Sequence, residues 1–216
     1  MSETPHHWGW ADLHGWQVLR PLLDVGGFLP WTEGAMSPAG LATVATEVSL
    51  AERRVVAELG SGASTVVLAR LARKLGGRVF AVEHSPEWAG WVRRALERDG
   101  LERIATVIEA PLRPHPLSLS GAPWYDPEAL GAMPSGGIDL LLIDGPPGHG
   151  EGMSRSRHPA LPALEGRLAP GALVILDDAD REGEREILDN WERELPWRFD
   201  RRPAERIAIG RRAEPG

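Results

Sequence analysis

The sequence has no cysteine, which excludes disulfide bonds, zinc–thiolate sites and a cysteine nucleophile and is consistent with a reducing compartment. Lys74 is its only lysine, so the other basic side chains are arginine and histidine. No apolar run approaches the roughly 18 residues that a membrane-spanning helix needs. Residues 1–16 also lack a basic region followed by an apolar one, so we expect no signal peptide and a cytoplasmic protein.

Charge and composition limit the class of protein further. The net charge of −7, from 31 acidic and 24 basic residues, argues against a nucleic-acid backbone or an anionic membrane as the main partner. The 25 glycines and 19 prolines make the chain rich in turns, while 42% hydrophobic residues are enough for a packed core. The length of 216 residues suits one α/β domain with at most a small appendage.

Short apolar runs alternate with helical segments from residue 38 onward. The predicted strands are 54–59, 78–83, 104–108, 138–143 and 172–176, and the predicted helices are 38–50, 63–75, 86–99, 159–168 and 181–194. This alternation is typical of a doubly wound α/β fold, in which helices cover both faces of a parallel sheet. Two further short strands, 197–201 and 206–209, predict an antiparallel hairpin at one edge.

Two segments lie outside this alternation. Residues 1–37 form an N-terminal extension with a short helix predicted at 13–23, and residues 38–216 form the α/β domain. Residues 110–137 are a loop rich in proline and glycine that is too long for a plain connection. They could be a binding loop, a lid or a mobile segment.

Ligands of such a sheet bind beyond the carboxyl ends of its strands. The first strand runs into Glu58-Leu59-Gly60-Ser61-Gly62-Ala63-Ser64-Thr65, where the two glycines allow a tight turn and the following helix offers free N–H groups. Thr65 stands where a dinucleotide fingerprint has its third glycine, and Glu58 would repel a pyrophosphate. A ligand with an ammonium and a carboxylate therefore fits better than NAD, and the alternative is an ordinary strand-to-helix turn.

Two further strand ends carry candidate ligand contacts. Glu83 follows the second strand, 21 residues after Gly62, a spacing that suits a carboxylate bound to both hydroxyls of a ribose. His84 could line the same pocket or be exposed. Ala110 follows the third strand, where a small residue would leave room for an adenine ring.

Three aspartates follow the next two strands of the sheet. Asp144 comes after the fourth strand, and Asp177 and Asp178 come after the fifth. Their oxygens could hold Mg²⁺ and leave positions open for substrate and water. Alternatively, Asp178 caps the following helix and Asp177 pairs with an arginine such as Arg181.

Two histidines and two arginines lie near these aspartates. A histidine of near-neutral pKa could remove a proton from a substrate hydroxyl, and His149 is preferred to His158 because it follows Asp144 by five residues. Both could equally be exposed loop residues. Arg155 and Arg157 could bind an acidic substrate group or be solvated.

Taken in order, these motifs resemble the class I S-adenosylmethionine-dependent methyltransferases over about residues 38–210. The closest likeness is to a bacterial family with Glu-Leu-Gly-Ser-Gly-x-Ser-Thr, Asp-Gly-Pro-Pro and Leu-Asp-Asp. The resemblance implies a Rossmann-like, mostly parallel sheet of seven strands with the last one antiparallel. It also implies S-adenosylmethionine (SAM) as cofactor. Glu58, Gly60 and Gly62 would lie along its methionine part, together with Ser61 and Thr65; Glu83 and His84 would lie at the ribose, Ala110 at the adenine, and Asp144 at the methionine end and the substrate.

The set of Asp144, Asp177 and Asp178 also resembles the metal triad of the divalent-metal O-methyltransferases. The resemblance implies a metal ion, Mg²⁺, that holds substrate hydroxyls beside the methyl donor. This chain departs from that pattern because it has Asp178 where asparagine is frequent and lacks the usual lysine after Asp144. If a base is needed, His149 must take the place of the lysine.

The resulting hypothesis is transfer of a methyl group from SAM to a hydroxyl oxygen of a small-molecule acceptor. Two alternatives remain open, an NAD-linked oxidoreductase and a non-catalytic nucleoside-binding protein with the same fold. The chain also has nine tryptophans against three phenylalanines and one tyrosine. Four of them are expected to be packing residues, namely Trp88, Trp91, Trp191 and Trp197. The other five could cover the acceptor, or fill grooves or a homodimer interface: Trp8, Trp10, Trp16, Trp31 and Trp124.

Overall fold

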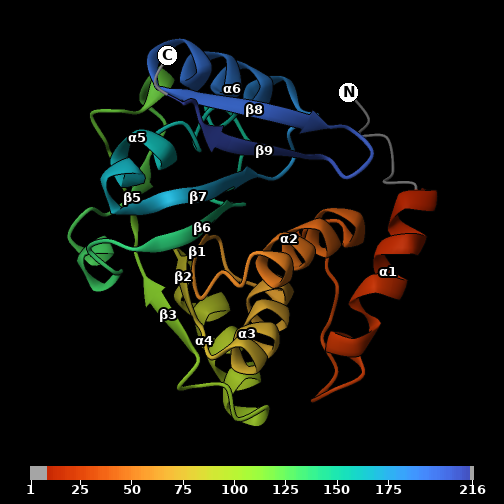
Figure 1. Ribbon diagram of the computed structural model, residues 1–216. Helices are drawn as coiled ribbons and strands as arrows, with labels where there is room; N and C mark the ends of the chain where they lie inside the picture. The colour runs from red at the N-terminus through yellow and green to blue at the C-terminus, as the bar shows by residue number, and fades with distance from the viewer. Residues whose placement is uncertain (1–8, 215–216) are drawn as a thin grey trace.

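A computed structural model describes residues 9–214 of the chain. Its main sheet has seven strands in the order β3-β2-β1-β6-β7-β9-β8 (Figure 1). The strands are β1 (Val55–Leu59), β2 (Arg78–Glu83), β3 (Ala105–Glu109), β6 (Ile138–Ile143), β7 (Leu168–Leu176), β8 (Trp197–Arg202) and β9 (Ile207–Arg212). The first five pair in parallel, while β9 is antiparallel to both β7 and β8. The predicted fold class, including the terminal hairpin, is confirmed.

Helices cover both faces of this sheet. They are α1 (Trp10–Leu23), α2 (Pro38–Leu50), α3 (Ala63–Leu75), α4 (Pro86–Arg98), α5 (Ala160–Leu164) and α6 (Glu182–Glu194). Side chains of α1 to α4 form one hydrophobic cluster with one face of the sheet, and side chains of α5 and α6 form a second cluster on the other face. Figure 1 shows α1, α2 and α3 on one side and α5 and α6 on the other. None of the helices within residues 9–214 has the length and apolar character needed to span a membrane.

Local sequence signals explain where the helices begin and end. Ser37 caps α2 by accepting a hydrogen bond from the backbone N–H of Gly40 at 3.0 Å, and Pro38 occupies the first helical position. Ser85 caps α4 in the same way through the N–H of Trp88 at 3.3 Å. Gly76 ends α3 with φ of 68°, a left-handed conformation that favours glycine.

The two largest shifts from the predicted boundaries lie next to each other, while the first helix begins at Trp10 and the last strand ends at Arg212, each three residues beyond its prediction. The helix predicted at 159–168 is shorter, because α5 gives way to a 3₁₀ helix, η3 (Glu165–Arg167), and β7 then begins at Leu168, four residues earlier than predicted. A helix of five residues is enough to cross between β6 and β7 here because much of that connection is the irregular stretch 144–159.

The segment 110–137 is ordered and packed. It contains the short antiparallel strands β4 (Leu112–Arg113) and β5 (Trp124–Tyr125) and two 3₁₀ helices, η1 (Leu119–Gly121) and η2 (Ala129–Ala132). Trp124 and Tyr125 are completely buried in the second hydrophobic cluster. Trp124 is therefore a core residue, and the expectation that it covers an acceptor is wrong for this structure.

The described part of the N-terminal extension packs on the α/β domain. Leu19 and Leu22 of α1 belong to the first hydrophobic cluster, and α1 lies beside α2 in Figure 1. The following turn is held by a buried ion pair, in which Arg70 donates to the carbonyl of Gly27 and Asp99 accepts from the N–H of Gly27 at 2.9 Å. Residues 28–36, which we call the N-terminal strap, then run to the start of α2.

Candidate functional site

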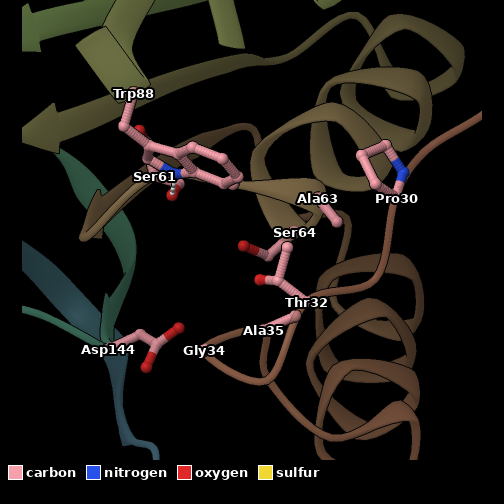
Figure 2. A pocket seen from close by; sticks show the side chains of 10 residues that line it. Pro30, Thr32, Gly34, Ala35, Ser61, Ala63, Ser64, Trp88 and Asp144 are labelled. Atoms are coloured by element: carbon pink, nitrogen blue, oxygen red, sulfur yellow. Dashed lines mark hydrogen bonds between the residues drawn. The ribbon is translucent and has the colours of Figure 1, made fainter. Parts of the chain in front are cut away.

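A pocket lies at the carboxyl ends of β1 and β6, next to the first turn of α3 (Figure 2). Its volume is about 270 Å³. The lining residues are Pro30, Thr32, Gly34, Ala35, Ser61, Gly62, Ala63, Ser64, Trp88 and Asp144. Figure 2 shows the Asp144 carboxylate on one side of the space and the hydroxyls of Ser64 and Thr32 on the other. The pocket thus lies where the sequence predicted ligand contacts.

The glycine turn after β1 brings two strand ends close together. Gly60 has φ of 88°, and a side-chain carbon at this position would lie 3.0 Å from the backbone nitrogen of Gly145. The sequence therefore needs glycine here for two reasons, a left-handed conformation and the close approach of the turn after β6. Gly62 precedes α3, and its N–H donates to the Thr65 hydroxyl at 2.9 Å. Gly62 lines the pocket, while Gly60 and Thr65 hold the turn to which it belongs.

Glu58 lies in β1 with none of its surface exposed. Its Oε2 accepts a hydrogen bond from the Thr65 hydroxyl at 2.6 Å, whereas Oε1 has no hydrogen-bond partner among residues 9–214. Burial raises the pKa of Glu58 to about 7, although the nearby hydroxyls of Ser64 and Thr65 act in the opposite direction. A buried carboxyl group with one unpartnered oxygen beside the glycine turn is suited to a cationic ligand group.

Glu83 is also buried and lies on the other side of the glycine turn. Its Oε2 accepts from the backbone N–H and the hydroxyl of Ser61, at 3.1 and 2.9 Å, and its Oε1 accepts from the N–H of Ser85. Burial alone would raise the pKa of Glu83, but hydrogen bonds from His84, Ser85 and Ser61 outweigh it and hold the pKa below its usual value. In this structure the Ser61 hydroxyl thus occupies an acceptor site on Glu83 that a ligand hydroxyl could take.

The remaining predicted cofactor contacts lie just outside the pocket. His84 is partly exposed and places Nδ1 3.0 Å from Glu83. Ala110 is buried, and its N–H donates to the carbonyl of Glu83 at 2.8 Å. Like Glu58 and Glu83, neither is among the lining residues, so the roles of all four at a cofactor remain predictions.

Trp88 is one of the lining side chains that sequence analysis missed. It was predicted to be a packing residue, yet its indole N–H donates to the carbonyl of Ser61 at 2.6 Å and its ring lines the pocket. Its ring also stacks on Trp91, with centroids 4.9 Å apart. The only available signal was its place in the first turn of the helix that follows Glu83.

The N-terminal extension reaches the pocket, but not through the tryptophans that lie within residues 9–37. The strap contributes Pro30, Thr32, Gly34 and Ala35, whereas Trp31 packs edge-on against Trp16 and donates to the carbonyl of Met36. Trp10 is 88% exposed on α1, and Trp8 lies outside the described residues. Trp191 and Trp197 are buried, which confirms their predicted packing role.

The three aspartates come together as predicted. Asp144, Asp177 and Asp178 each place a carboxylate oxygen within 4.8 Å of the others. Burial raises the pKa of Asp144 to about 7 against the opposing effect of Arg157. Burial, and then the charges of Asp144 and Asp178, raise the pKa of Asp177 well above its usual value. Two neighbouring strand ends therefore form one acidic cluster beside the pocket.

An arginine lies in the centre of this cluster. Arg157 is only 3% exposed, and its Nη2 lies 3.4 Å from Asp144 and 3.2 Å from Asp178. Its Nη1 donates to the carbonyl of Asp177 and its Nε to the carbonyl of Pro146, at 3.0 and 3.2 Å. Arg157 is thus neither solvated nor exposed to a substrate, and both sequence-based interpretations of it are wrong.

The alternative pairing predicted for the aspartates is also only partly right. Arg181 pairs with Asp178 at 2.7 Å rather than with Asp177, and Arg206 pairs with the other oxygen of Asp178 at 2.8 Å. The side chain of Asp178 does not cap α6, whose N-cap residue is Arg181. Asp178 instead forms ion pairs with three arginines, Arg157, Arg181 and Arg206.

The cluster has the right ligand type for Mg²⁺ but the wrong charge balance. Mg²⁺ prefers carboxylate and water oxygens at about 2.1 Å. An ion bound to Asp144 and Asp178 would lie within a few ångströms of Arg157, which already contacts both. Arg157, Arg181 and Arg206 already pair with these carboxylates and offset the negative charge that would attract the ion. The residues as arranged therefore do not fit a divalent metal ion.

The two histidines differ in position. His149 is exposed in the turn after β6 and is not among the lining residues, so its role as a base remains a prediction. His158 is buried, with Nδ1 2.8 Å from the carbonyl of Leu117, and joins the 110–137 segment to the domain. Arg155 pairs with Glu186 at the surface.

The sheet has seven strands with an antiparallel β9, a glycine turn follows β1, and acidic residues lie at four strand ends. Together these features define a Rossmann-like methyltransferase. The chain belongs to the family described as "Methyltransferase domain", which matches residues 57–179. That stretch runs from the glycine turn to the Asp177–Asp178 pair. The prediction of a class I methyltransferase is confirmed, and the NAD-linked oxidoreductase is set aside. No curated protein sequence matches the chain.

Solved structures share the fold over nearly the whole chain. The methyltransferase PaMTH1 of Podospora anserina, bound to SAH, is 13% identical, with a TM-score of 0.66 over 97% of this chain and 90% of that chain. An O-methyltransferase of Bacillus cereus in complex with SAH is 19% identical, with a TM-score of 0.59 over 96% and 92%. The O-methyltransferase TomG of Streptomyces achromogenes, in complex with SAM, is 14% identical, with a TM-score of 0.58 over 95% and 91%. At these identities the likeness concerns the fold alone.

Proposed function

We propose that this chain transfers a methyl group from SAM to a hydroxyl oxygen of a small-molecule acceptor. The observation that carries the proposal is that the glycine turn lines one pocket, with Glu58 and Glu83 bound to that turn, in a chain of the methyltransferase family. SAM- and SAH-bound structures with the same fold support the cofactor. The acidic net charge and the small pocket support a small acceptor rather than a nucleic acid.

The residues present fit this cofactor. The unpartnered Oε1 of Glu58 would receive the ammonium of the methionine part, and the first turn of α3 would offer N–H groups to its carboxylate. Glu83 would bind the ribose hydroxyls after releasing the Ser61 hydroxyl. Ala110 and His84 would border the adenosine part, next to Trp88.

When bound, SAM supplies a methyl group already activated by the sulfonium charge. The protein must then align the acceptor oxygen and remove its proton. Asp144 faces the pocket and would accept the hydrogen bond of the acceptor hydroxyl. His149, five residues further in the exposed turn, is the proposed base and would act after that turn moves towards the pocket.

Isothermal titration calorimetry with S-adenosylhomocysteine (SAH) and with NAD tests the cofactor. We expect SAH to bind and NAD not to bind. Glu83→Gln should lose at least about tenfold in SAH affinity, or about 1.4 kcal/mol. Glu87→Gln, at an exposed position one turn away, is the control and should bind as the wild type does. Failure of the wild type to bind SAH would refute the proposal.

Turnover of SAM to SAH with an extract of small molecules tests the reaction. Asp144→Asn should abolish turnover while SAH still binds, and His149→Ala should lower it at neutral pH. A wild type that binds SAH but never turns over would favour the non-catalytic alternative. The metal-assisted form is the alternative to this reaction: the three carboxylates within 4.8 Å favour it, and Arg157 between two of them opposes it. It predicts that a chelator abolishes turnover.

A further inference from the structure

The acidic cluster beside the pocket already contains a cation. Each of the three guanidinium nitrogens of Arg157 has at least one partner, and two of those partners are Asp144 and Asp178. Glu184, also buried, lies 3.7 Å from Nη1 on the remaining side. The same two carboxylates that would bind a divalent ion therefore bind a planar, permanently charged group.

The surroundings of Asp178 leave little room for another cation. Its Oδ1 is paired with Arg206, and its Oδ2 is paired with both Arg181 and Arg157. The backbone of Asp178 has φ of 57°, in the left-handed region that few residues other than glycine, asparagine and aspartate adopt. Asp178, one of the predicted Mg²⁺ ligands, is thus already paired with three guanidinium groups.

The position of Arg157 also explains the orientation of Asp144. The turn after β6 is tied to Arg157 twice, through the carbonyl of Pro146 and through the carboxylate of Asp144. The carbonyl of Asp177 ties the neighbouring strand end to the same side chain. Asp144 is consequently held between a fixed cation on one side and the pocket on the other.

We propose that Arg157 takes the place of the metal ion as the permanent cation of the acceptor site, so that this methyltransferase works without a divalent metal. Arg157 is a positioning residue that holds Asp144 towards the acceptor. An acceptor would then be bound through one hydroxyl at Asp144, and it need not carry two neighbouring hydroxyls that chelate an ion. The proposal rests on the proposed function only for the identity of the reaction.

The first test is a titration of metal-free wild-type protein with Mg²⁺ and with Mn²⁺, followed by calorimetry and by thermal unfolding. We expect no heat of binding and no shift of the unfolding temperature. Binding of one ion per chain that is lost in Asp178→Asn would overturn the proposal, whether or not the ion affects turnover.

The second test removes the guanidinium. Arg157→Gln leaves three carboxylates close together, so this variant should gain Mn²⁺ binding and an unfolding temperature that rises with Mn²⁺. If Arg157→Gln does not fold in metal-free buffer, recovery of folding on addition of Mn²⁺ would equally show that the variant has gained Mn²⁺ binding. An Arg157→Gln variant that neither binds Mn²⁺ nor is stabilised by it would contradict the proposal. Arg155→Gln, at the surface pair with Glu186, is the matched control and should behave as the wild type.

A titration with SAH separates this inference from the proposed function. If SAH binds to the wild type and a divalent ion also binds at Asp178, only the role of Arg157 is wrong. If SAH does not bind, the proposed function is wrong whatever the metal titrations show. Arg157→Lys, which keeps the charge but not the fork of donors, should remain free of metal and bind SAH while its turnover falls.

Discussion

Glu58 places a fully buried carboxyl group at the end of β1, and burial raises its pKa from 4.5 to about 7. Between these values the folded protein keeps a proton that the unfolded chain has lost. Unfolding therefore releases a proton in this window, and the free energy of unfolding falls as the pH rises from about 4.5 to about 7. The full pKa shift corresponds to a loss of about 3 kcal/mol in the free energy of unfolding.

Glu58→Gln should remove this part of the pH dependence, because glutamine resembles the protonated acid. We expect the variant to match the wild type near pH 5 and to be more stable above about pH 7. Urea denaturation at a series of pH values measures the difference. Glu87→Gln, at an exposed site, should leave the profile unchanged. Parallel profiles for the wild type and Glu58→Gln would contradict this account.

Trp88 supports a second prediction for a single residue. Trp88→Phe keeps a ring in the pocket wall but removes the hydrogen bond to the carbonyl of Ser61. A hydrogen bond of about 1 kcal/mol corresponds to about a fivefold loss of affinity, which calorimetry with SAH would detect. Trp91→Phe changes the stacked partner and should have a smaller effect. Equal losses in both variants would show that stacking, not the hydrogen bond, shapes the site.

Single residues also show where sequence reasoning works and where it stops. Glu58, Gly60 and Asp144 were predictable because each directly follows or ends an apolar strand, and the ends of parallel strands meet at one edge. Trp88 lies on a helix, and its contact with Ser61 depends on how α4 packs against the glycine turn. Arg157 was noticed only as part of a polar stretch, because its partners lie 11 to 27 residues away along the chain.

At the scale of elements, the N-terminal strap depends on the buried pair of Arg70 and Asp99. Both side chains are nearly inaccessible to solvent, and Arg70 also donates to the carbonyls of Leu22 and Gly27. Asp99→Ala would leave a buried guanidinium without its carboxylate, which costs about 3–5 kcal/mol. We expect that loss in urea denaturation, together with weaker SAH binding because the strap forms one wall of the pocket.

The exposed pair of Arg20 and Asp24 is a matched control for this prediction. Its donor and acceptor are 3.0 Å apart, but both side chains are more than 60% exposed. Asp24→Ala should therefore cost less than about 1 kcal/mol and leave SAH binding unchanged. Similar losses for Asp99→Ala and Asp24→Ala would mean that burial does not set the strength of the Arg70 pair.

Some of the secondary-structure elements could be predicted from the sequence, and the packing of others could not. The strands and the long helices followed from apolar periodicity and from caps such as Ser37 and Ser85. The packing of the 110–137 segment did not follow, because its proline and glycine content is typical of loops in general. The burial of Trp124, Tyr125, Leu130 and Met133 shows that this segment covers the second hydrophobic cluster.

At the scale of the whole molecule, the division at residue 37 is the main open prediction. Gly15 of α1 is buried against the start of α2, and a side-chain carbon there would lie 2.5 Å from the backbone of Pro38. Leu19 and Leu22 enter the same hydrophobic cluster as α2 and α3. These contacts favour a single cooperative unit in which residues 9–37 belong to the core of the α/β domain.

Gly15→Ala tests this cooperativity. Alanine favours a helix by about 1 kcal/mol over glycine, but forcing α1 away from α2 should cost more, as overpacked cores lose about 1–3 kcal/mol. We expect one unfolding transition, shifted to lower urea, and reduced SAH affinity because the strap moves with α1. Gly131→Ala, where a side-chain carbon meets nothing within 4 Å, is the control. A wild-type unfolding curve with two transitions, of which Gly15→Ala shifts only one, would instead show that the N-terminal extension folds as a separate appendage.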